Sequence, residues 1–211
     1  MQENETLRYY ARNALAFVSS TQNVDMSEIQ NSFSALLPKD AHVLDLGCGS
    51  GRDSLAFLRK GFFVDAADAC PEFCEATKKL TEGFNTSGKI RIRQIQFSEL
   101  CESKKYDGIW ACSSLLHLPK QDLPAVLLKI EAALNPNGIF YCSFKFGDFE
   151  GMRNGRYFSD FSETELCNLI GKSASLEKIK LWKTKDSRPE RSEIWLNSLW
   201  RNRPAEHLPD L

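Results

Sequence analysis

Three glycines at alternate positions, Gly47, Gly49 and Gly51, follow a short apolar run and precede a helical pattern. A strand that turns over glycines into a helix is typical of parallel α/β folds, in which the turn brings a ligand against main-chain N–H groups. Glycine permits this approach because it has no Cβ atom and tolerates positive φ angles. The dinucleotide spacing G-x-G-x-x-G would place its third glycine where this chain has Arg52, so the turn disfavours a nicotinamide cofactor.

A second apolar run, from Phe62 to Ala67, is followed by Asp68. An acid about twenty residues beyond such a turn can accept hydrogen bonds from ribose hydroxyls. The alternative interpretation is an ordinary strand-to-helix connection, with Asp68 capping a helix that begins at Pro71. Because the turn and the acid both follow strand-like runs, we prefer the first interpretation and expect a cofactor that contains adenosine.

With 211 residues, of which 42% are hydrophobic, the chain has enough apolar material for one well-buried domain and not comfortably for two. We expect a single domain over residues 1–203, with a helical cap at 1–37, an α/β core at 38–203 and a loose tail at 204–211. The formal net charge is -1 and the two signs are interspersed, so nucleic acid is a disfavoured partner. The chain begins without a secretory apolar segment and has no stretch long enough to span a bilayer, which predicts a cytoplasmic location and no membrane attachment.

Seven cysteines occur at irregular spacing without a C-x-x-C pair, a pattern that fits neither a disulfide framework nor a zinc site. We expect most of them to be reduced and buried, and no bound metal. Cys70 and Cys74 are four residues apart, so both thiols would share one helix face if the helix begins by Cys70. Simple packing on the inner side of that helix is the alternative.

Apolar runs and helical periodicity alternate along the rest of the chain, which predicts a parallel sheet with helices on both faces. We expect strands at 42–46, 62–67, 89–95, 106–111, 139–144, 176–183 and 193–200. Helices are expected at 7–18, 27–37, 52–60, 71–80 and 121–134, with a further helix that starts at a capping box at 162–165 and ends near 170. The first two helices should cap the cofactor cleft, a turn is expected at 135–138, and the last two strands should form an antiparallel hairpin.

At this level of detail the chain resembles the class I S-adenosylmethionine-dependent methyltransferases, in particular small members of the methyltransferase-domain and tellurite-resistance-like type. The matching segments are 43–53, 65–71, 106–119, 135–145, 156–166 and 186–197. The resemblance implies a doubly wound, mostly parallel, seven-stranded Rossmann-like sheet with an antiparallel last strand and an N-terminal helical cap. It also implies S-adenosylmethionine as the cofactor and S-adenosylhomocysteine as its product.

Ligands of such sheets lie beyond the carboxyl ends of the strands. The residues expected to contact the cofactor are therefore Asp45, Gly47, Cys48, Gly49, Ser50, Gly51, Arg52, Asp53, Asp68, Ala69, Gln96, Phe97, Ala111 and Leu116. Arg52 can pair with the methionine carboxylate of the cofactor, or can simply be a solvated arginine in the first turn of a helix. Gln96 stands where the family often has an acid that binds the adenine amino group. Its amide oxygen is also an acceptor, and an exposed strand end is the alternative.

Catalytic roles are predicted for Tyr10 and His117. The family places an early tyrosine over the cofactor near the transferable methyl group, and a histidine can act as a general base near neutral pH. Packing in the helix and capping of a loop before Pro119 are the alternatives. Tyr9, Lys145, Arg156 and Tyr157 are the expected acceptor contacts, and the glycine-flanked segment 147–155 is a candidate lid.

The predicted function is methyl transfer to a small-molecule acceptor by direct in-line displacement, in a monomer or a weak homodimer. Methylation of nucleic-acid bases at exocyclic amino groups is disfavoured, because the family motif Asn/Asp/Ser-Pro-Pro-aromatic is absent after the fourth strand. A thiol or metalloid methyltransferase that uses Cys70 and Cys74 is one alternative. A cofactor-binding protein without transfer activity is another, and a dehydrogenase is a distant one.

Overall fold

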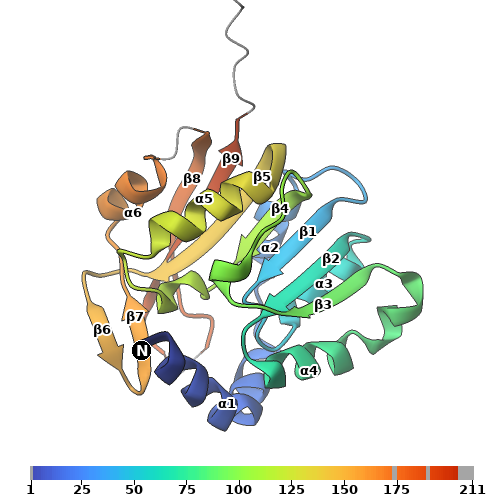
Figure 1. Ribbon diagram of the computed structural model, residues 1–211, viewed down its shortest axis with the longest axis horizontal. Coiled ribbons are helices and arrows are strands. Elements are labelled where there is room, and N and C mark those ends of the chain that lie inside the picture. The colour runs from blue at the N-terminus through green and yellow to red at the C-terminus, as the bar shows by residue number, and fades with distance from the viewer. Residues whose placement is uncertain (1, 173–174, 189–190, 204–211) are drawn as a thin grey trace, which may run out of the picture.

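The computed structural model describes residues 2–172, 175–188 and 191–203, so the tail expected at 204–211 lies outside the described residues. Within them, seven strands form one sheet in the order β3-β2-β1-β4-β5-β9-β8 (Figure 1). Their bounds are β1 His42–Leu46, β2 Phe63–Asp68, β3 Ile90–Gln94, β4 Tyr106–Ala111, β5 Leu134–Lys145, β8 Leu176–Lys185 and β9 Ile194–Asn202.

The first five strands in this order, β3 to β5, run parallel to one another, with β1 between β2 and β4. The last strand, β9, runs antiparallel to both β5 and β8. The predicted doubly wound, mostly parallel sheet with an antiparallel last strand is thereby confirmed. Because the chain leaves β1 toward β2 on one side and returns to β4 on the other, the loops after β1 and β4 diverge and open a crevice at this end of the sheet.

Helices cover both faces of the sheet. The α-helices are α1 Gln2–Thr21, α2 Ser27–Ser34, α3 Arg52–Arg59, α4 Pro71–Leu80, α5 Leu123–Ala133 and α6 Glu163–Ile170, and short 3-10 helices occur at η1 Glu82–Ser87, η2 Phe97–Glu99 and η3 Leu115–His117. On one face, Phe33 of α2 and Phe57 of α3 contact the fully buried Trp110 of β4. On the opposite face, apolar side chains of α5 and α6 pack against the sheet. Each large side chain buried in these two layers stabilises the fold by about 2 kcal/mol.

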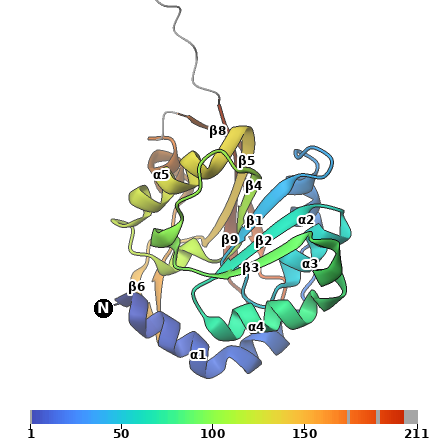
Figure 2. The same ribbon diagram turned by 45° about the vertical axis from the view of Figure 1, so that its right-hand side comes forward.

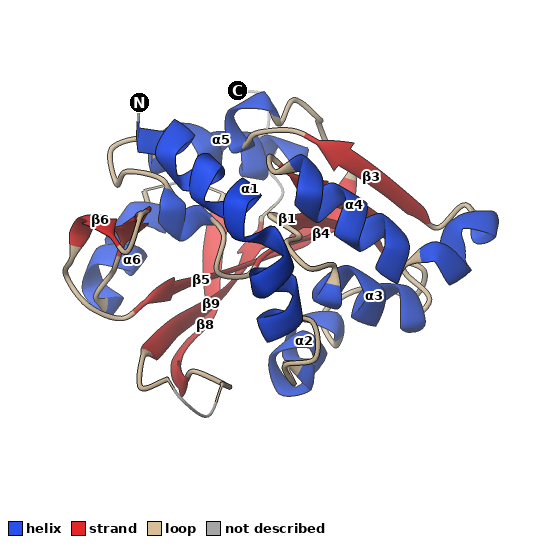
Figure 3. Ribbon diagram, turned by 90° about the horizontal axis from the view of Figure 1, so that it is seen from below, coloured by secondary structure: helices blue, strands red, loops and turns tan. Residues whose placement is uncertain are grey.

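Helix α1 crosses the end of the sheet where the parallel strands finish (Figure 3). It lies beside α4 (Figure 2), and the ring of Phe17 contacts that of Phe73 at a centroid distance of 5.1 Å. Near its start, Thr6 Oγ1 accepts a hydrogen bond of 2.9 Å from the main-chain N–H of Tyr157. Helix α1 therefore closes the crevice. The prediction that both N-terminal helices would cap the cleft needs a correction, because α2 packs mainly against the sheet face and only borders the cavity through Ile29.

Differences from the predicted elements are local. The turn expected at 135–138 is an irregularity within β5, because Leu134 already pairs with Tyr106 and regular pairing resumes at Ile139. Helix α2 ends at Ser34, three residues before the predicted end. The segment considered as a lid contains β6 Glu150–Arg153 and the turn of an unpredicted hairpin, and the second strand, β7 Arg156–Ser159, follows directly after it. Both strands are too short to give a readable alternation.

Two further expectations concern single helices. The capping box at the start of α6 is confirmed, since Ser162 and Glu165 each accept a hydrogen bond from the main-chain N–H of the other. Among the residues described, no helix combines the length and the apolar character that crossing a membrane would require.

Candidate active site

The glycine turn after β1 packs tightly against its neighbours at Gly47. Its φ of +87° is unfavourable for residues with side chains, and a Cβ atom placed there would lie 2.3 Å from Cβ of Ser114. The main-chain N–H groups of Gly47 and Cys48 both donate to the carbonyl of Ala67, at 2.7 and 3.0 Å. Ser114 in turn donates to the carbonyl of Leu46 at 2.6 Å. Gly47 therefore lets β1, β2 and the loop after β4 meet at one point.

Gly51 serves packing rather than ligand approach. A Cβ atom at this position would lie 2.9 Å from Cα of Thr77, so the missing side chain makes room for helix α4. Gly51 does not line the cavity, which corrects the expectation that all three glycines face the ligand. Gly51, with a φ of +78°, is the N-cap residue of helix α3, which starts directly after the turn.

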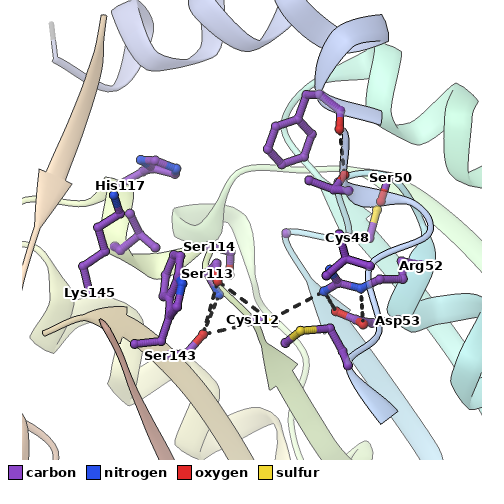
Figure 4. A pocket seen from close by; sticks show the side chains of 18 of the residues that line it. Cys48, Ser50, Arg52, Asp53, Cys112, Ser113, Ser114, His117, Ser143 and Lys145 are labelled. Carbon is purple, nitrogen blue, oxygen red and sulfur yellow. Dashed lines mark hydrogen bonds and ion pairs between the residues drawn. The ribbon is translucent and has the colours of Figure 1, made fainter. Parts of the chain in front are cut away.

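A cavity of about 210 Å³ lies between the glycine turn and helix α1. Of the predicted site residues, it is lined by Tyr10, Gly47, Cys48, Gly49, Ser50, Arg52, Asp53, Asp68, Ala69, Phe97, Leu116, His117, Lys145 and Arg156. Figure 4 shows Cys48, Ser50, Arg52 and Asp53 on one side and His117 and Lys145 on the other, with Cys112, Ser113, Ser114 and Ser143 between them. We call the first side, together with Asp68, Ala69 and Phe97, the turn wall. We call the second side, together with Tyr10 and Arg156, the helix wall.

Asp68 stands at the end of β2 on the turn wall. Its two carboxylate oxygens accept hydrogen bonds from the main-chain N–H groups of Gly49 at 3.0 Å and Cys70 at 2.9 Å. Burial raises the pKa of Asp68 to about 6, and these hydrogen bonds offset part of that effect. An acceptor that borders the cavity and is already tied to the glycine turn is suited to a polar ligand with hydroxyl groups.

Arg52 and Asp53 form an ion pair at the start of α3. Arg52 donates to both Asp53 oxygens at 2.8 Å, and Asp53 also accepts from Trp110 at 2.9 Å and from Gln30 at 2.6 Å. Burial alone would raise the pKa of Asp53, but the Arg52 charge and these hydrogen bonds hold it below its ordinary value. The proposed pairing of Arg52 with a cofactor carboxylate must therefore compete with Asp53.

Three more of the predicted cofactor contacts, besides Gly51, lie outside the cavity. Asp45 and Ala111 are buried within their strands and do not reach the cavity. Asp45 accepts a hydrogen bond of 2.6 Å from Ser54, and burial raises its pKa to about 8. Gln96 also lies outside the cavity, where it caps the short helix η2, whereas the ring of Phe97 lines the cavity. Along β1 and β4 the side chains face the packed layers, and this removes Asp45 and Ala111 from the cavity.

The helix wall contains a chain of hydrogen bonds. Tyr10 Oη lies 2.7 Å from Nε2 of His117, and Nδ1 of His117 lies 2.7 Å from the carbonyl of Tyr157. Because a carbonyl can only accept, Nδ1 carries the hydrogen, and Nε2 accepts from the Tyr10 hydroxyl. Nη1 of Arg156 donates to Tyr10 Oη at 3.3 Å. Burial lowers the pKa of His117 to about 4 and raises the pKa of Tyr10, so both side chains are neutral at pH 7.

The remaining predicted acceptor contacts are divided. Lys145 borders the cavity and pairs with Glu193 at 2.8 Å. Tyr9 and Tyr157 lie outside the lining, because the Tyr157 hydroxyl turns to Glu150 at 2.9 Å and the ring of Tyr9 packs 4.8 Å from Cζ of Arg156. Their expected contact with an acceptor is therefore indirect.

Several cavity residues were not assigned to the site from the sequence. Phe17 is seven residues after Tyr10 and so falls on the same face of α1, a spacing that could have identified it. Ser143 lies near the carboxyl end of β5, where strand-end reasoning could also have found it. Phe73 comes from α4, and no local pattern distinguishes it from a core residue.

Comparison with known proteins agrees with this geometry. Residues 43–138 match the family described as methyltransferase domain. A ubiquinone biosynthesis O-methyltransferase of Actinobacillus pleuropneumoniae is 33% identical over 107 residues, which are 48% of this chain and 44% of that protein. The chain thus spans less than half the length of the curated relatives it matches.

Two solved structures extend the likeness over the whole fold. The Burkholderia thailandensis 1,6-didemethyltoxoflavin-N1-methyltransferase, with bound 1,6-didemethyltoxoflavin and S-adenosylhomocysteine, has a TM-score of 0.73 and 26% identity, and the match covers 94% of this chain and 91% of that one. TehB from Haemophilus influenzae, at a TM-score of 0.69 and 16% identity over 94% of this chain and 67% of that one, shares the fold.

The strand order, the glycine turn and the acid after β2 together define a Rossmann-like fold built to hold an adenosine-containing cofactor. Residues 43–138, just under half of the chain, match a methyltransferase domain, and the whole fold is similar to that of a methyltransferase with bound S-adenosylhomocysteine. S-adenosylmethionine is accordingly its cofactor, as the sequence predicted.

Proposed function

We propose that this protein transfers the methyl group of S-adenosylmethionine to a small-molecule acceptor. The observation that carries the proposal is the cavity in which the turn wall faces a helix wall that holds the Tyr10–His117 hydrogen bond. The acceptor is small because α1 closes the cavity over the strand ends, and the similarity to enzymes named for small-molecule acceptors supports the same reading.

The turn wall has groups that fit each part of the cofactor. Asp68 would accept from the ribose hydroxyls, and Ala69 and Phe97 would pack against the adenine ring. Main-chain donors between Gly47 and Ser50 would face the methionine portion. When bound, the cofactor supplies a methyl group already activated by a positively charged sulfur, so the protein contributes mainly positioning and exclusion of water.

On the helix wall, Tyr10 and His117 would orient the acceptor. Nε2 of neutral His117 can take the Tyr10 proton while Tyr10 Oη receives a proton from the acceptor. A histidine with a pKa of about 4 is a weak base, so we expect this relay to assist rather than dominate. Its larger contribution is to hold the Tyr10 hydroxyl in one orientation toward the cavity.

Calorimetry and a turnover assay test the proposal together. The protein should bind S-adenosylhomocysteine and S-adenosylmethionine, and should release S-adenosylhomocysteine when a correct small acceptor is added. Failure to bind either molecule would overturn the proposal. Binding without release across a broad panel of oxygen, nitrogen and sulfur acceptors would instead favour the cofactor-binding protein without transfer activity.

The thiol or metalloid alternative receives less support. Cys70 and Cys74 do not line the cavity, and burial raises the pKa of their thiols to about 12 and about 11. Loss of turnover after replacing both by serine, with cofactor binding intact, would revive it. The cytoplasmic location, the single domain and the monomeric or weakly dimeric state remain predictions.

A further inference from the structure

Arg156 differs from the other cationic side chains that border the cavity. Each of the others has a carboxylate partner or faces water. They are Arg52 with Asp53, Lys145 with Glu193, Arg188 with Asp186 and Arg191 with Glu193, while Lys185 is exposed. Arg156 is partly buried, and no carboxylate among the side chains that the structure describes lies within 4.0 Å of its guanidinium nitrogens.

Aromatic rings pack against the flat faces of the Arg156 guanidinium group, but most of the N–H groups at its edge have no hydrogen-bond acceptor in the described chain. Its Cζ lies 4.8 Å from the ring centre of Tyr9, 5.6 Å from that of Tyr10 and 5.0 Å from that of Phe158. Aromatic faces attract a cation but accept no in-plane N–H bond. Of the five N–H groups, one donates to Tyr10 Oη at 3.3 Å, and Nε is buried without a partner in the described chain.

Arg153 on the same hairpin is a useful contrast. Its Nε also lacks a partner, but its Nη2 binds both carboxylate oxygens of Asp160, at 2.8 and 3.1 Å, and it does not line the cavity. The fold thus supplies an internal anion for the arginine that faces away from the cavity. The arginine that faces the cavity receives none.

We infer that the methyl acceptor carries a carboxylate group and that Arg156 binds it. A partly buried guanidinium without a counter-ion is costly, and its planar fork matches a carboxylate in two parallel hydrogen bonds. His117 is neutral and Lys145 is already paired, so the helix wall offers one free positive charge, which suits a singly charged carboxylate better than a doubly charged phosphate. This inference rests on the proposed function, because it names the substrate class of the same cavity.

The contacts of Arg156 also place the carboxylate relative to the acceptor atom. Since Nη1 of Arg156 and Nε2 of His117 both bind Tyr10 Oη, a carboxylate on the guanidinium lies beside the Tyr10 hydroxyl. The nucleophilic atom of the acceptor would then be a neighbouring group on the same small molecule. Two of the rings around Arg156, those of Tyr10 and Phe158, also line the cavity and favour an acceptor with a planar, apolar body.

The test uses the full chain saturated with S-adenosylhomocysteine, titrated with benzoate, with the uncharged benzamide of the same shape, and with inorganic phosphate. The readout is the Nε–H signal of Arg156 in a proton–nitrogen correlation spectrum, assigned by its loss in Arg156→Lys. Benzoate should shift this signal saturably, and benzamide and phosphate should bind at least about tenfold more weakly. Arg156→Gln should weaken benzoate about tenfold, measured on other cavity signals, while the exposed Arg12→Gln on α1 should leave its affinity unchanged.

Three outcomes would overturn the inference. They are the absence of an Arg156 shift up to high millimolar benzoate, equal responses to benzoate and benzamide, and tighter binding of phosphate. A fourth is a more than tenfold loss of S-adenosylhomocysteine affinity in Arg156→Gln, which would assign the guanidinium to the carboxylate of the cofactor. If S-adenosylhomocysteine fails to bind the wild-type chain, the proposed function itself fails, and the two failures are therefore distinguishable.

Discussion

The two walls of the cavity are built from different parts of the chain. The turn wall presents main-chain groups and the ends of β1 and β2, which lie close together in sequence and are fixed by the sheet. The helix wall presents side chains that meet across long stretches of chain, since Tyr10 lies 107 residues from His117 and 146 residues from Arg156. Under the proposed function, the cofactor would be bound by local backbone geometry, and the acceptor by contacts between distant segments.

The largest effect is expected from a substitution that disrupts the turn wall and leaves the helix wall unchanged. Gly47→Val should abolish measurable S-adenosylhomocysteine binding, a loss of at least about 100-fold, because the residue has φ +87° and its side chain would collide with Ser114. Calorimetry measures the binding, and thermal unfolding shows how much of the loss comes from instability. Gly83→Ala, at a position where a Cβ atom would meet nothing within 4 Å, is the matched control. Normal binding by Gly47→Val would show that the turn does not hold the cofactor.

The next effect concerns the helix wall alone. Tyr10→Phe should lower kcat about 30-fold, because it removes the hydroxyl that joins His117 and Arg156, and should change the Kd of S-adenosylhomocysteine less than about twofold. Turnover of the acceptor identified by screening and calorimetry give the two values. The control is Tyr9→Phe, which keeps the ring beside Arg156 outside the cavity lining. An equal fall in both variants would argue against a role for the Tyr10 hydroxyl.

The pH dependence of turnover sharpens the same point. Because burial lowers the pKa of His117 to about 4, its Nε2 stays an acceptor above that value, and kcat at saturating cofactor should not fall between pH 8 and pH 5 through this residue. A fall in kcat centred near pH 6.5 that disappears in His117→Gln would contradict the buried, neutral state.

A smaller effect is expected from the charge of Asp68 on the turn wall, as distinct from the size of its side chain. Burial raises the pKa of Asp68 to about 6, so the ionised form that accepts best from ribose is lost as pH falls through this value. Affinity for S-adenosylhomocysteine should fall about tenfold from pH 8 to pH 5, one unit below that pKa. Asp68→Asn should bind about tenfold more weakly at pH 8 and show little pH dependence, since it retains the size without the charge. Unchanged pH dependence in this variant would assign the titration to another group.

The smallest effect compares two cations on the helix wall. Lys145→Gln should weaken benzoate less than about threefold, because Glu193 at 2.8 Å already neutralises the lysine, whereas the unpaired Arg156 carries the larger loss. Both variants are titrated with benzoate in the presence of S-adenosylhomocysteine. A greater loss for Lys145→Gln than for Arg156→Gln would transfer the anion site to Lys145.

The same difference between the walls explains what could be predicted from the sequence. The strand ranges follow from local periodicity and the position of Asp68 from the strand-end rule, whereas the doubly wound sheet is implied by the family resemblance. Spacing could not show that Gly51 makes room for Thr77, nor that Asp45 is buried against Ser54, because both depend on which side of the chain packs. Arg156 lacks a carboxylate partner because of where the acidic residues lie in the folded chain, and no local sequence pattern shows this.

Trp110 gives the molecule an intrinsic reporter of occupancy. Its indole N–H donates to Asp53, which borders the cavity, and its ring is stacked on Tyr141 with centroids 3.9 Å apart. Trp195 lines the cavity itself, so two of the four tryptophans in the chain are connected to the cavity, one directly and one through Asp53. Ultraviolet emission should therefore change when either ligand enters, and association kinetics can be followed by stopped-flow on the unlabelled protein.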